Sequence, residues 1–357
     1  MSQIIIGMSG GVDSAVAASV LKDKGYEVEA VFMKNWEEDS EYCTSERDYI
    51  DALQVCEILN IPLHTVNFAK EYWDRVFEYF LEEYKNGRTP NPDVLCNNEI
   101  KFKEFLNYAI ELGASKIATG HYVRSDNKDG DIKLIKGLDH KKDQSYFLHG
   151  LNQNQISNTL FPIGGLVKSD VRKKAKELGF NNFGKKDSVG ICFIGERNIK
   201  DFLKQYIPAN PGHIVTNKGM KIGKHDGLMY YTIGQRKGLG IGGGHSESDG
   251  AWYVIEKDLA GNQLIVAQGH DNSALYHRSL KASKLHWISG DPPTHHILNA
   301  KIRYRSNDVP CKITDLEGDT ISIKFDRSCF GIAPGQSVVF YSGEICLGGA
   351  VIDSYWN

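Results

Sequence analysis

The sequence predicts an α/β protein: an N-terminal doubly wound, Rossmann-like parallel sheet, a small linking domain and a C-terminal β-barrel. In the first half of the 357-residue chain, apolar runs of strand length alternate with stretches that repeat apolar residues at helical spacing. From about residue 205 the helical periodicity fades, glycine becomes dense and short alternating strands take over. The length suffices for two or three domains, which we expect over residues 1–204, 205–274 and 275–357.

The first strand and the first helix enclose a loop suited to bind phosphate. The apolar run 4–8 predicts a buried strand, and valines at helical spacing from residue 12 predict a helix that begins near Asp13. A strand that turns directly into a helix leaves backbone N–H groups free, and the helix dipole adds positive charge. Glycines permit a close approach, and serine hydroxyls add donors. The expected phosphate-binding residues are Gly7, Met8, Ser9, Gly10, Gly11, Val12, Asp13 and Ser14.

This loop differs from the Walker A loop, because Asp13 occupies the place of the lysine that would reach the β- and γ-phosphates. The sequence SGGVDS instead resembles the PP-loop of N-type ATP pyrophosphatases. That resemblance implies cleavage of ATP between its α- and β-phosphates and adenylation of a substrate oxygen, with Mg²⁺ accompanying ATP. A generic Ser/Gly turn is the alternative interpretation.

Further strands are expected over 28–34, 62–68 and 116–120, with helices over 45–59 and 70–85. In a parallel sheet, ligands bind at the carboxyl ends of the strands. Met33, Gly120 and His121 fall at such ends, and the Met33 thioether is suited to lie against adenine.

Two cysteines stand in distinctive surroundings. Two prolines in the stretch RTPNPDVLC argue against regular helix, so we expect a stiff loop presenting Asn91, Asp93 and Cys96. Cys192 lies between two glycines, close to lysines that could lower the pKa of its thiol. An ordinary core strand explains the residues around Cys192 equally well.

In the second half, strands are expected over 252–256 and 263–267, with hairpin turns at 260–262 and 342–344. The stretch 238–243 matches G-x-G-x-x-G by letter, but no helical pattern follows it. We therefore reject a dinucleotide site there and expect a loop.

Composition is that of a globular protein without a membrane span. The chain is 41% hydrophobic and 24% charged, with a mean hydropathy of -0.37. Its seven cysteines form no C-x-x-C pair, which argues against a zinc ribbon or a disulfide framework. The first strand begins too early to leave room for a signal peptide. We expect a cytoplasmic protein with reduced thiols and no metal ligands of its own.

The net charge of -3 does not indicate a nucleic-acid binder, but the charges are unevenly distributed. Residues 37–51 are acidic, whereas basic residues gather over 168–176, 185–186, 236–237 and 303–305. Such runs form either solvated helix faces or a track for a polyphosphate backbone, and charge alone does not decide between them.

Taken together, the motifs resemble the tRNA-specific 2-thiouridylase (MnmA/TrmU) family nearly end to end. The matching stretches are GMSGGVDS (7–14), TPNPDVLCN (89–97), ATGHY (118–122), KDQSYFL (142–148), KKDSVGICFIGE (185–196), YTIGQRKGLGIGG (231–243) and APGQSVVFY (333–341). The resemblance implies ATP-dependent replacement of O2 by sulfur on the wobble uridine (U34) of tRNA, releasing AMP and pyrophosphate.

The same resemblance implies roles for individual residues. Cys192 carries a persulfide, Cys96 is the second thiol, and Asp93 is a general acid or base. The flipped uridine is held by Asn91, Pro92 and Asp93. Further tRNA contacts are expected at His121, Asp143, Gln144, Ser145, Arg303, Tyr304 and Gln336. Either Cys96 liberates sulfide from the persulfide or the persulfide attacks C2 and Cys96 resolves it as a disulfide. The implied partners are tRNA and a persulfide donor, either a cysteine desulfurase or a relay protein.

Three other functions are rivals to this interpretation, and each makes a different demand on the residues. Another adenylating enzyme with this loop, such as an amidotransferase-like synthetase or an argininosuccinate synthase, would not need the two cysteines. A thiolase that uses an iron–sulfur cluster would need grouped cysteines, which the chain lacks. A non-catalytic RNA-binding module with ATP as a structural ligand would bind tRNA without releasing AMP.

Overall fold

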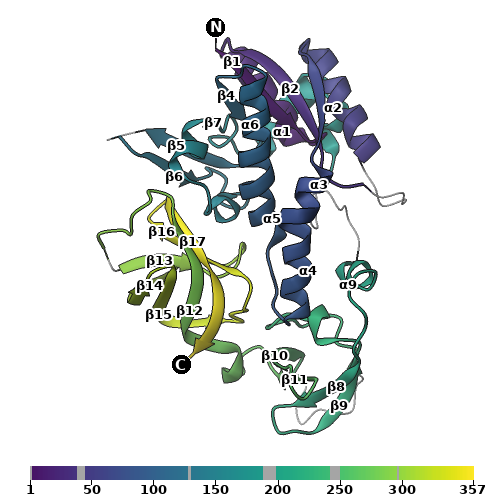
Figure 1. Ribbon diagram of the computed structural model, residues 1–357, viewed down its shortest axis with the longest axis vertical. Helices are drawn as coiled ribbons and strands as arrows, with labels where there is room; N and C mark the ends of the chain where they lie inside the picture. Colours follow the sequence, from purple (N-terminus) through teal and green to yellow (C-terminus); the bar gives the residue numbers. More distant parts are fainter. Residues whose placement is uncertain (1, 38–44, 128–129, 188–197, 242–249, 296) are drawn as a thin grey trace.

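A five-stranded parallel sheet with the order β3-β2-β1-β4-β7 forms the core of the N-terminal part. Its strands are β1 (Gln3–Met8), β2 (Glu27–Lys34), β3 (Leu63–Asn67), β4 (Lys116–Ala118) and β7 (Thr159–Leu160). The computed structural model describes the whole chain except residues 1, 38–44, 128–129, 188–197, 242–249 and 296 (Figure 1). The strand order reverses at β1, which is the arrangement of a doubly wound sheet.

Both faces of this sheet are buried, as the unbroken apolar run in β1 predicts. Ile4 and Ile6 point into one core cluster, and Ile5 points into another. The first cluster packs against α1 (Val12–Asp23), α2 (Ser45–Leu59) and α8 (Lys168–Glu177). The second packs against α6 (Phe105–Glu111) and the helices that lead into it.

The helix expected over 70–85 is broken by a widened turn. The chain forms α3 (Ala69–Tyr72), the π-helix η1 (Trp73–Phe77) and α4 (Glu78–Lys85) in direct succession. A second π-helix, η2 (Cys96–Glu104), follows the short helix α5 (Pro92–Leu95) and continues into α6. The apolar spacing predicted the helix over 70–85 but not its π-helical turn. Such turns often mark functional sites.

Smaller elements complete the N-terminal part: η3 (Ser145–Leu148), α7 (Gln153–Ser157), η4 (Asn181–Gly184) and α9 (Ile199–Leu203). A hairpin, β5 (Val123–Asn127) and β6 (Ile132–Lys136), follows the fourth strand of the sheet. This hairpin was not predicted from the sequence.

The middle part is a four-stranded sheet with the order β10-β11-β8-β9. It comprises β8 (Gly212–Thr216), β9 (Lys221–His225), η5 (Leu228–Tyr230), β10 (Trp252–Asp258) and β11 (Gln263–Gln268). The turn expected at 260–262 joins β10 to β11, with Asn262 at a positive φ of 48°.

The C-terminal part is a closed six-stranded barrel, with the pairing of β12 and β17 completing the ring. After η6 (Ser273–Leu275), its strands are β12 (Tyr276–Trp287), β13 (Ile297–Lys301), β14 (Val309–Glu317), β15 (Thr320–Phe330), β16 (Ser337–Ser342) and β17 (Ile345–Trp356). The β5–β6 hairpin extends the barrel sheet, because Leu134 and Ile135 pair with Cys346 and Ile345 of β17. The N-terminal part is thereby joined to the barrel by backbone hydrogen bonds.

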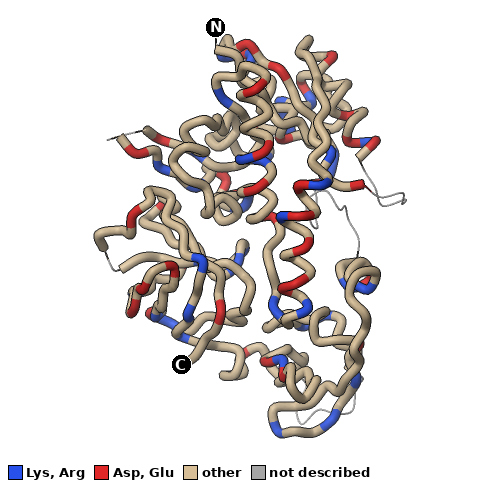
Figure 2. Tube along the Cα trace, in the orientation of Figure 1, with Lys and Arg blue, Asp and Glu red and all other residues tan. Residues whose placement is uncertain are grey.

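The predicted fold class, a doubly wound sheet followed by a linking domain and a β-barrel, is confirmed. The exact boundaries at 204/205 and 274/275 stay predictions. No helix within the described residues is long and apolar enough to span a bilayer. Figure 2 shows acidic and basic residues interspersed over all three parts.

Candidate active site

The loop between β1 and α1 has the geometry that the predicted anion cradle requires. Gly11 occupies the N-cap of α1 without a side-chain cap, which leaves N–H groups of the first turn available. The hydroxyls of Ser9 and Ser14 lie 3.2 Å apart, and Ser14 Oγ accepts a hydrogen bond from Ser9 N. Gly10 has a φ of +70°, and a Cβ there would collide with the backbone of Asp48. The remaining predicted residues, Gly7, Met8 and Val12, complete this loop and its flanks.

Asp13, which replaces the Walker lysine, is the centre of an ion-pair network. Lys168 at the start of α8 places its Nζ 2.7 and 2.8 Å from the two carboxylate oxygens of Asp13. Tyr122 donates its hydroxyl proton to Asp13 Oδ1 at 2.7 Å. Lys168 also lies 2.6 Å from Asp187, which accepts a second hydrogen bond from Lys142 at 2.5 Å. The loop therefore does have an adjacent lysine, supplied by a distant part of the chain.

This network perturbs the ionisation of its members. Burial raises the pKa of the Asp187 carboxyl, but hydrogen bonds from Lys142 and Lys168 outweigh it and lower that pKa to about 2. Burial, together with the negative charge of Asp13, raises the pKa of Tyr122 far above its ordinary value. At neutral pH Asp187 is thus charged and Tyr122 is a fixed hydrogen-bond donor.

The acidic and basic runs of the sequence partly neutralise each other beside the cradle. Lys185 binds Asp48 at 2.7 Å and Asp51 at 2.5 Å, and it also donates to Gly10 O at 3.2 Å. Asn182 donates to the same carbonyl at 3.0 Å. These contacts fix the backbone of the loop, so the run at 185–186 is structural in part, and any role in following a polyphosphate stays a prediction.

Two of the other predicted strand-end residues, Met33 and Gly120, lie against this loop or the strand before it. The Met33 methyl group would lie 3.1 Å from a Cβ placed on Gly7. A Cβ on Gly120 would lie 2.7 Å from Ser14 N, so only glycine allows the chain just after β4 to approach α1 this closely. His121 is buried, with its Nδ1 2.9 Å from Thr119 Oγ1. Burial and the charge of Lys101 lower the pKa of His121 well below its ordinary value, so its ring is neutral.

The segment expected to be a stiff loop is instead the beginning of a helix. Pro92 is the first residue of α5, where a missing N–H costs nothing, and the Asn91 side chain caps the helix by accepting a hydrogen bond from Asp93 N at 3.2 Å. The expectation was wrong because proline is excluded from helix interiors but not from the first turn. The Asn91 oxygen is thus already engaged, while Asn91, Pro92 and Asp93 all remain partly accessible.

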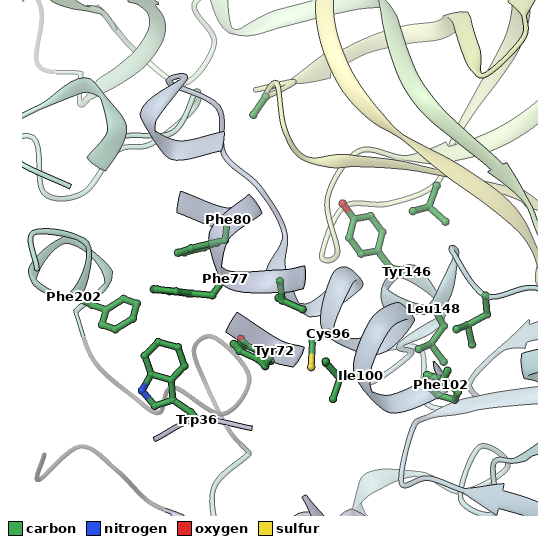
Figure 3. Packing of buried hydrophobic residues seen from close by; sticks show 14 of the residues in the cluster. Trp36, Tyr72, Phe77, Phe80, Cys96, Ile100, Phe102, Tyr146, Leu148 and Phe202 are labelled. Atoms are coloured by element: carbon green, nitrogen blue, oxygen red, sulfur yellow. The ribbon is translucent and has the colours of Figure 1, made fainter. Parts of the chain in front are cut away.

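Cys96 begins η2 and is fully buried. It belongs to a cluster that also contains Tyr72, Ile100 and an aromatic group around Trp36. Figure 3 shows its sulfur within this cluster, with Tyr72 and Ile100 next to it in the view. Buried apolar surroundings make a thiol unreactive. A catalytic role for Cys96 stays a prediction, and it would require that substrate binding exposes this thiol.

The barrel holds the segment that leads to Cys96. Gln336 donates to Thr89 O at 2.7 Å, and Thr89 N donates to Pro334 O at 2.8 Å. Arg88 donates to Ile352 O at 3.1 Å. Gln336, a predicted tRNA contact, thus lies at the junction between the barrel and the segment expected to hold the base.

Five further predicted tRNA contacts have partners inside the protein. Asp143 accepts hydrogen bonds from Gly137 N and Ser145 N, and the side chains of Asp143 and Ser145 are both buried. Gln144 Oε1 accepts from Tyr122 N at 2.9 Å, next to the ion-pair network. The Arg303 guanidinium donates to the carbonyls of Ile233 and Gly331 at 2.5 and 2.6 Å. Tyr304 packs on Phe147 with ring centroids 4.5 Å apart. Direct tRNA contact at these residues stays a prediction.

Cys192 lies outside the described residues, and its meeting with Cys96 stays a prediction. The last described residue before this segment is Asp187, which belongs to the Asp13 network beside the phosphate loop. The first described helix after it is α9, whose Phe202 contacts Trp36 and Phe77 at ring centroid distances of 6.1 and 5.6 Å. Phe202 thus belongs to the cluster that contains Cys96.

Two features of the site were not predicted from the sequence. Lys168 was noted only as part of a basic run, since nothing local signals that it reaches Asp13 across the fold. Asn35 follows β2 directly and is buried, although both of its side-chain polar atoms lack a hydrogen-bond partner among the described residues. For Asn35, the available signal in the sequence was a polar residue directly after a predicted strand. Within those residues, no group of three or more His, Cys, Asp or Glu side chains could hold a metal ion.

The comparisons with known proteins cover nearly the entire chain. The family described as "tRNA methyl transferase HUP domain" matches residues 2–196, "tRNA methyl transferase PRC-barrel domain" matches 200–268, and "Aminomethyltransferase beta-barrel domain" matches 277–352. The tRNA-specific 2-thiouridylase MnmA of Pasteurella multocida (strain Pm70) is 57% identical over 99% of this chain and 93% of its own. The protein of the same name from Salmonella arizonae is 57% identical over 98% of this chain and 96% of its own.

Proposed function

The chain belongs to the tRNA-specific 2-thiouridylase family, and from this premise we propose how its site carries out ATP-dependent tRNA thiolation. The proposed substrate is the wobble uridine, U34, and the proposed activated species is its O2-adenylate. The observation that supports this most is the cradle at Ser9–Ser14, with Lys168 and Lys185 converging on it at the carboxyl edge of the sheet.

In the first step, the uridine O2 attacks the α-phosphorus of ATP and the bond to the β-phosphate breaks. The free N–H groups at the start of α1 and the Ser9 and Ser14 hydroxyls would hold the departing pyrophosphate. Mg²⁺ would neutralise phosphate charge, and Asp13 is the carboxylate of the loop that suits such a hard cation. Both Asp13 oxygens bind Lys168, whose ammonium group would be available to the phosphates if a cation took its place.

In the second step, sulfur attacks C2, the C2–O2 bond breaks and AMP leaves with the oxygen. The sulfur would come from a persulfide on Cys192, charged by a persulfide donor in the cytoplasm. In one route Cys96 attacks the Cys192 sulfur and releases sulfide, which then attacks C2. In the other, the terminal persulfide sulfur attacks C2 first, and Cys96 then displaces it from Cys192. Both routes leave a Cys96–Cys192 disulfide, which an external thiol must reduce.

The position of Cys96 fits a role that begins only when substrate is bound. Cys96 is the first residue of the nine-residue segment η2, which leads into Phe105, whose ring would lie 3.4 Å from a Cβ on Gly7. The helical segment that begins at Cys96 therefore leads to the strand that carries the phosphate loop. Asp93 lies three residues earlier and is partly accessible, which supports the proposed exchange of a proton with the base or the thiol.

The proposal is tested by mass analysis of nucleosides from unmodified tRNA incubated with the protein, ATP and a persulfide donor. We expect 2-thiouridine and AMP from the wild type, and neither modified nucleoside nor disulfide from Cys96→Ser. Cys311→Ser is the matched control, because Cys311 is equally buried but lies in the barrel core. Full activity of Cys96→Ser would exclude the two-thiol chemistry and favour a different adenylating enzyme.

A further inference from the structure

Asn35 is a buried amide that the fold itself does not use. Asn35 directly follows β2, and it is 1% exposed. Among the described side chains, it is the one in which both the amide nitrogen and the amide oxygen are buried without a hydrogen-bond partner. Other buried amides keep one contact: Asn97 donates to Phe147 O at 3.1 Å, and Asn182 donates to Gly10 O at 3.0 Å. The unused pair of polar atoms in Asn35 needs an explanation.

Energetics favour a ligand as that explanation. A buried polar group without a hydrogen-bond partner destabilises a fold, and Asn35 has two such atoms. A leucine of similar size would incur neither cost. A group that brings its own donor and acceptor into the site would satisfy both atoms at once.

The position of Asn35 indicates which ligand this is. Gly7 and Met8 of β1 pair with Val31 and Phe32 of β2, so β2 continues past the point where β1 turns into the phosphate loop. Asn35 comes directly after that extension, two residues beyond Met33, whose methyl group lies against Gly7. In doubly wound nucleotide-binding folds the pyrophosphate lies on the loop after the first strand, and the adenosine lies toward the end of the second.

The chemistry of the side chain matches that position. An asparagine presents an N–H donor and a C=O acceptor side by side, which is the complement of the adenine 6-amino group and its neighbouring ring nitrogen. We propose that the Asn35 amide binds the adenine edge of ATP and makes the adenylation step selective for adenine nucleotides. This inference rests on the proposed function, because it assumes that ATP binds at the loop.

The test is a chemical double-mutant cycle measured by calorimetric binding to the full-length protein. The ligands are ATP, purine riboside triphosphate, which lacks only the 6-amino group, and pyrophosphate. The variant is Asn35→Leu, and the control is Asn67→Leu, an exposed asparagine at the end of the neighbouring strand β3. We expect Asn35→Leu to bind ATP roughly 10- to 100-fold more weakly than the wild type does. The variant should bind ATP and purine riboside triphosphate with equal affinity, and its affinity for pyrophosphate should be unchanged.

Stability provides a second readout. Because Asn35 makes no hydrogen bond in the described fold, Asn35→Leu should unfold at the same or higher denaturant concentration than the wild type. Three results would overturn the inference: wild-type nucleotide discrimination in Asn35→Leu, a weaker affinity for tRNA with ATP affinity unchanged, or a large loss of stability. The second would assign Asn35 to the uracil, and the third to the fold. Failure of the wild type to bind ATP at all would instead contradict the proposed function.

Discussion

Replacing Lys168 with methionine tests the idea that this lysine completes the phosphate loop. Lys168 is buried and lies within 2.8 Å of both Asp13 oxygens and 2.6 Å from Asp187. The carboxylates of Asp13 and Asp187 are about a third exposed and keep hydrogen bonds from Tyr122 and Lys142, so removing the lysine costs less than breaking a fully buried ion pair, about 1–3 kcal/mol. For a unit of this size that corresponds to a fall in melting temperature of roughly 2–12 °C.

The assay is urea denaturation followed by circular dichroism, together with AMP release in the presence of ATP, tRNA and a persulfide donor. Lys173→Met, on the outer face of the same helix, is the matched control, because Lys173 is exposed and its ion pair with Glu177 is 3.9 Å long. We expect that control to change stability by less than about 0.5 kcal/mol. The double variant Asp13→Asn, Lys168→Met should be less destabilised than the sum of its single variants. A Lys168→Met protein that matches Lys173→Met in stability and AMP release would refute the argument.

Three further predictions concern the loop, the ion-pair network and tRNA. Gly120→Ala should lose ATP binding by calorimetry, because its Cβ would lie 2.7 Å from Ser14 N and push the cradle apart; unchanged affinity would contradict the need for glycine there. The Asp187 carboxyl has a pKa lowered to about 2 from 3.8, so its stabilisation is complete above pH 4 and is lost as pH falls toward 2. Acid titration of unfolding should therefore show a loss in that window which Asp187→Asn lacks, whereas identical acid profiles would count against the network. Affinity for tRNA should fall steeply between low and moderate salt despite the net charge of -3, as filter binding can measure; a flat dependence would speak against phosphate contacts.

Local patterns predicted the features that local interactions create. The strand, the loop and the helix from residue 4 onward follow from an apolar run, small residues and helical spacing, and the structure reproduces them. The apolar run in β1 is unbroken because successive side chains of this strand enter the two core clusters on opposite faces of the sheet. The β-rich second half was likewise evident from its turn residues and short alternating strands.

Long-range contacts could not be predicted in the same way. The partner of Asp13 is 155 residues away, and no spacing rule connects them. Arg303 was expected only as a tRNA contact, and nothing local indicates that its guanidinium donates to the carbonyls of Ile233 and Gly331. The prolines near Cys96 were misinterpreted because their effect depends on where the helix begins, which the Asn91 cap determines.

The central claim is that two cysteines meet over an adenylated uridine. It is tested most directly by tryptic mass spectrometry after one turnover of protein charged with a persulfide. We expect a disulfide that links the peptides of Cys96 and Cys192, forms only when ATP and tRNA are both present, and accumulates in step with 2-thiouridine. Formation of 2-thiouridine without that linked peptide, and at an equal rate in Cys96→Ser, would contradict it.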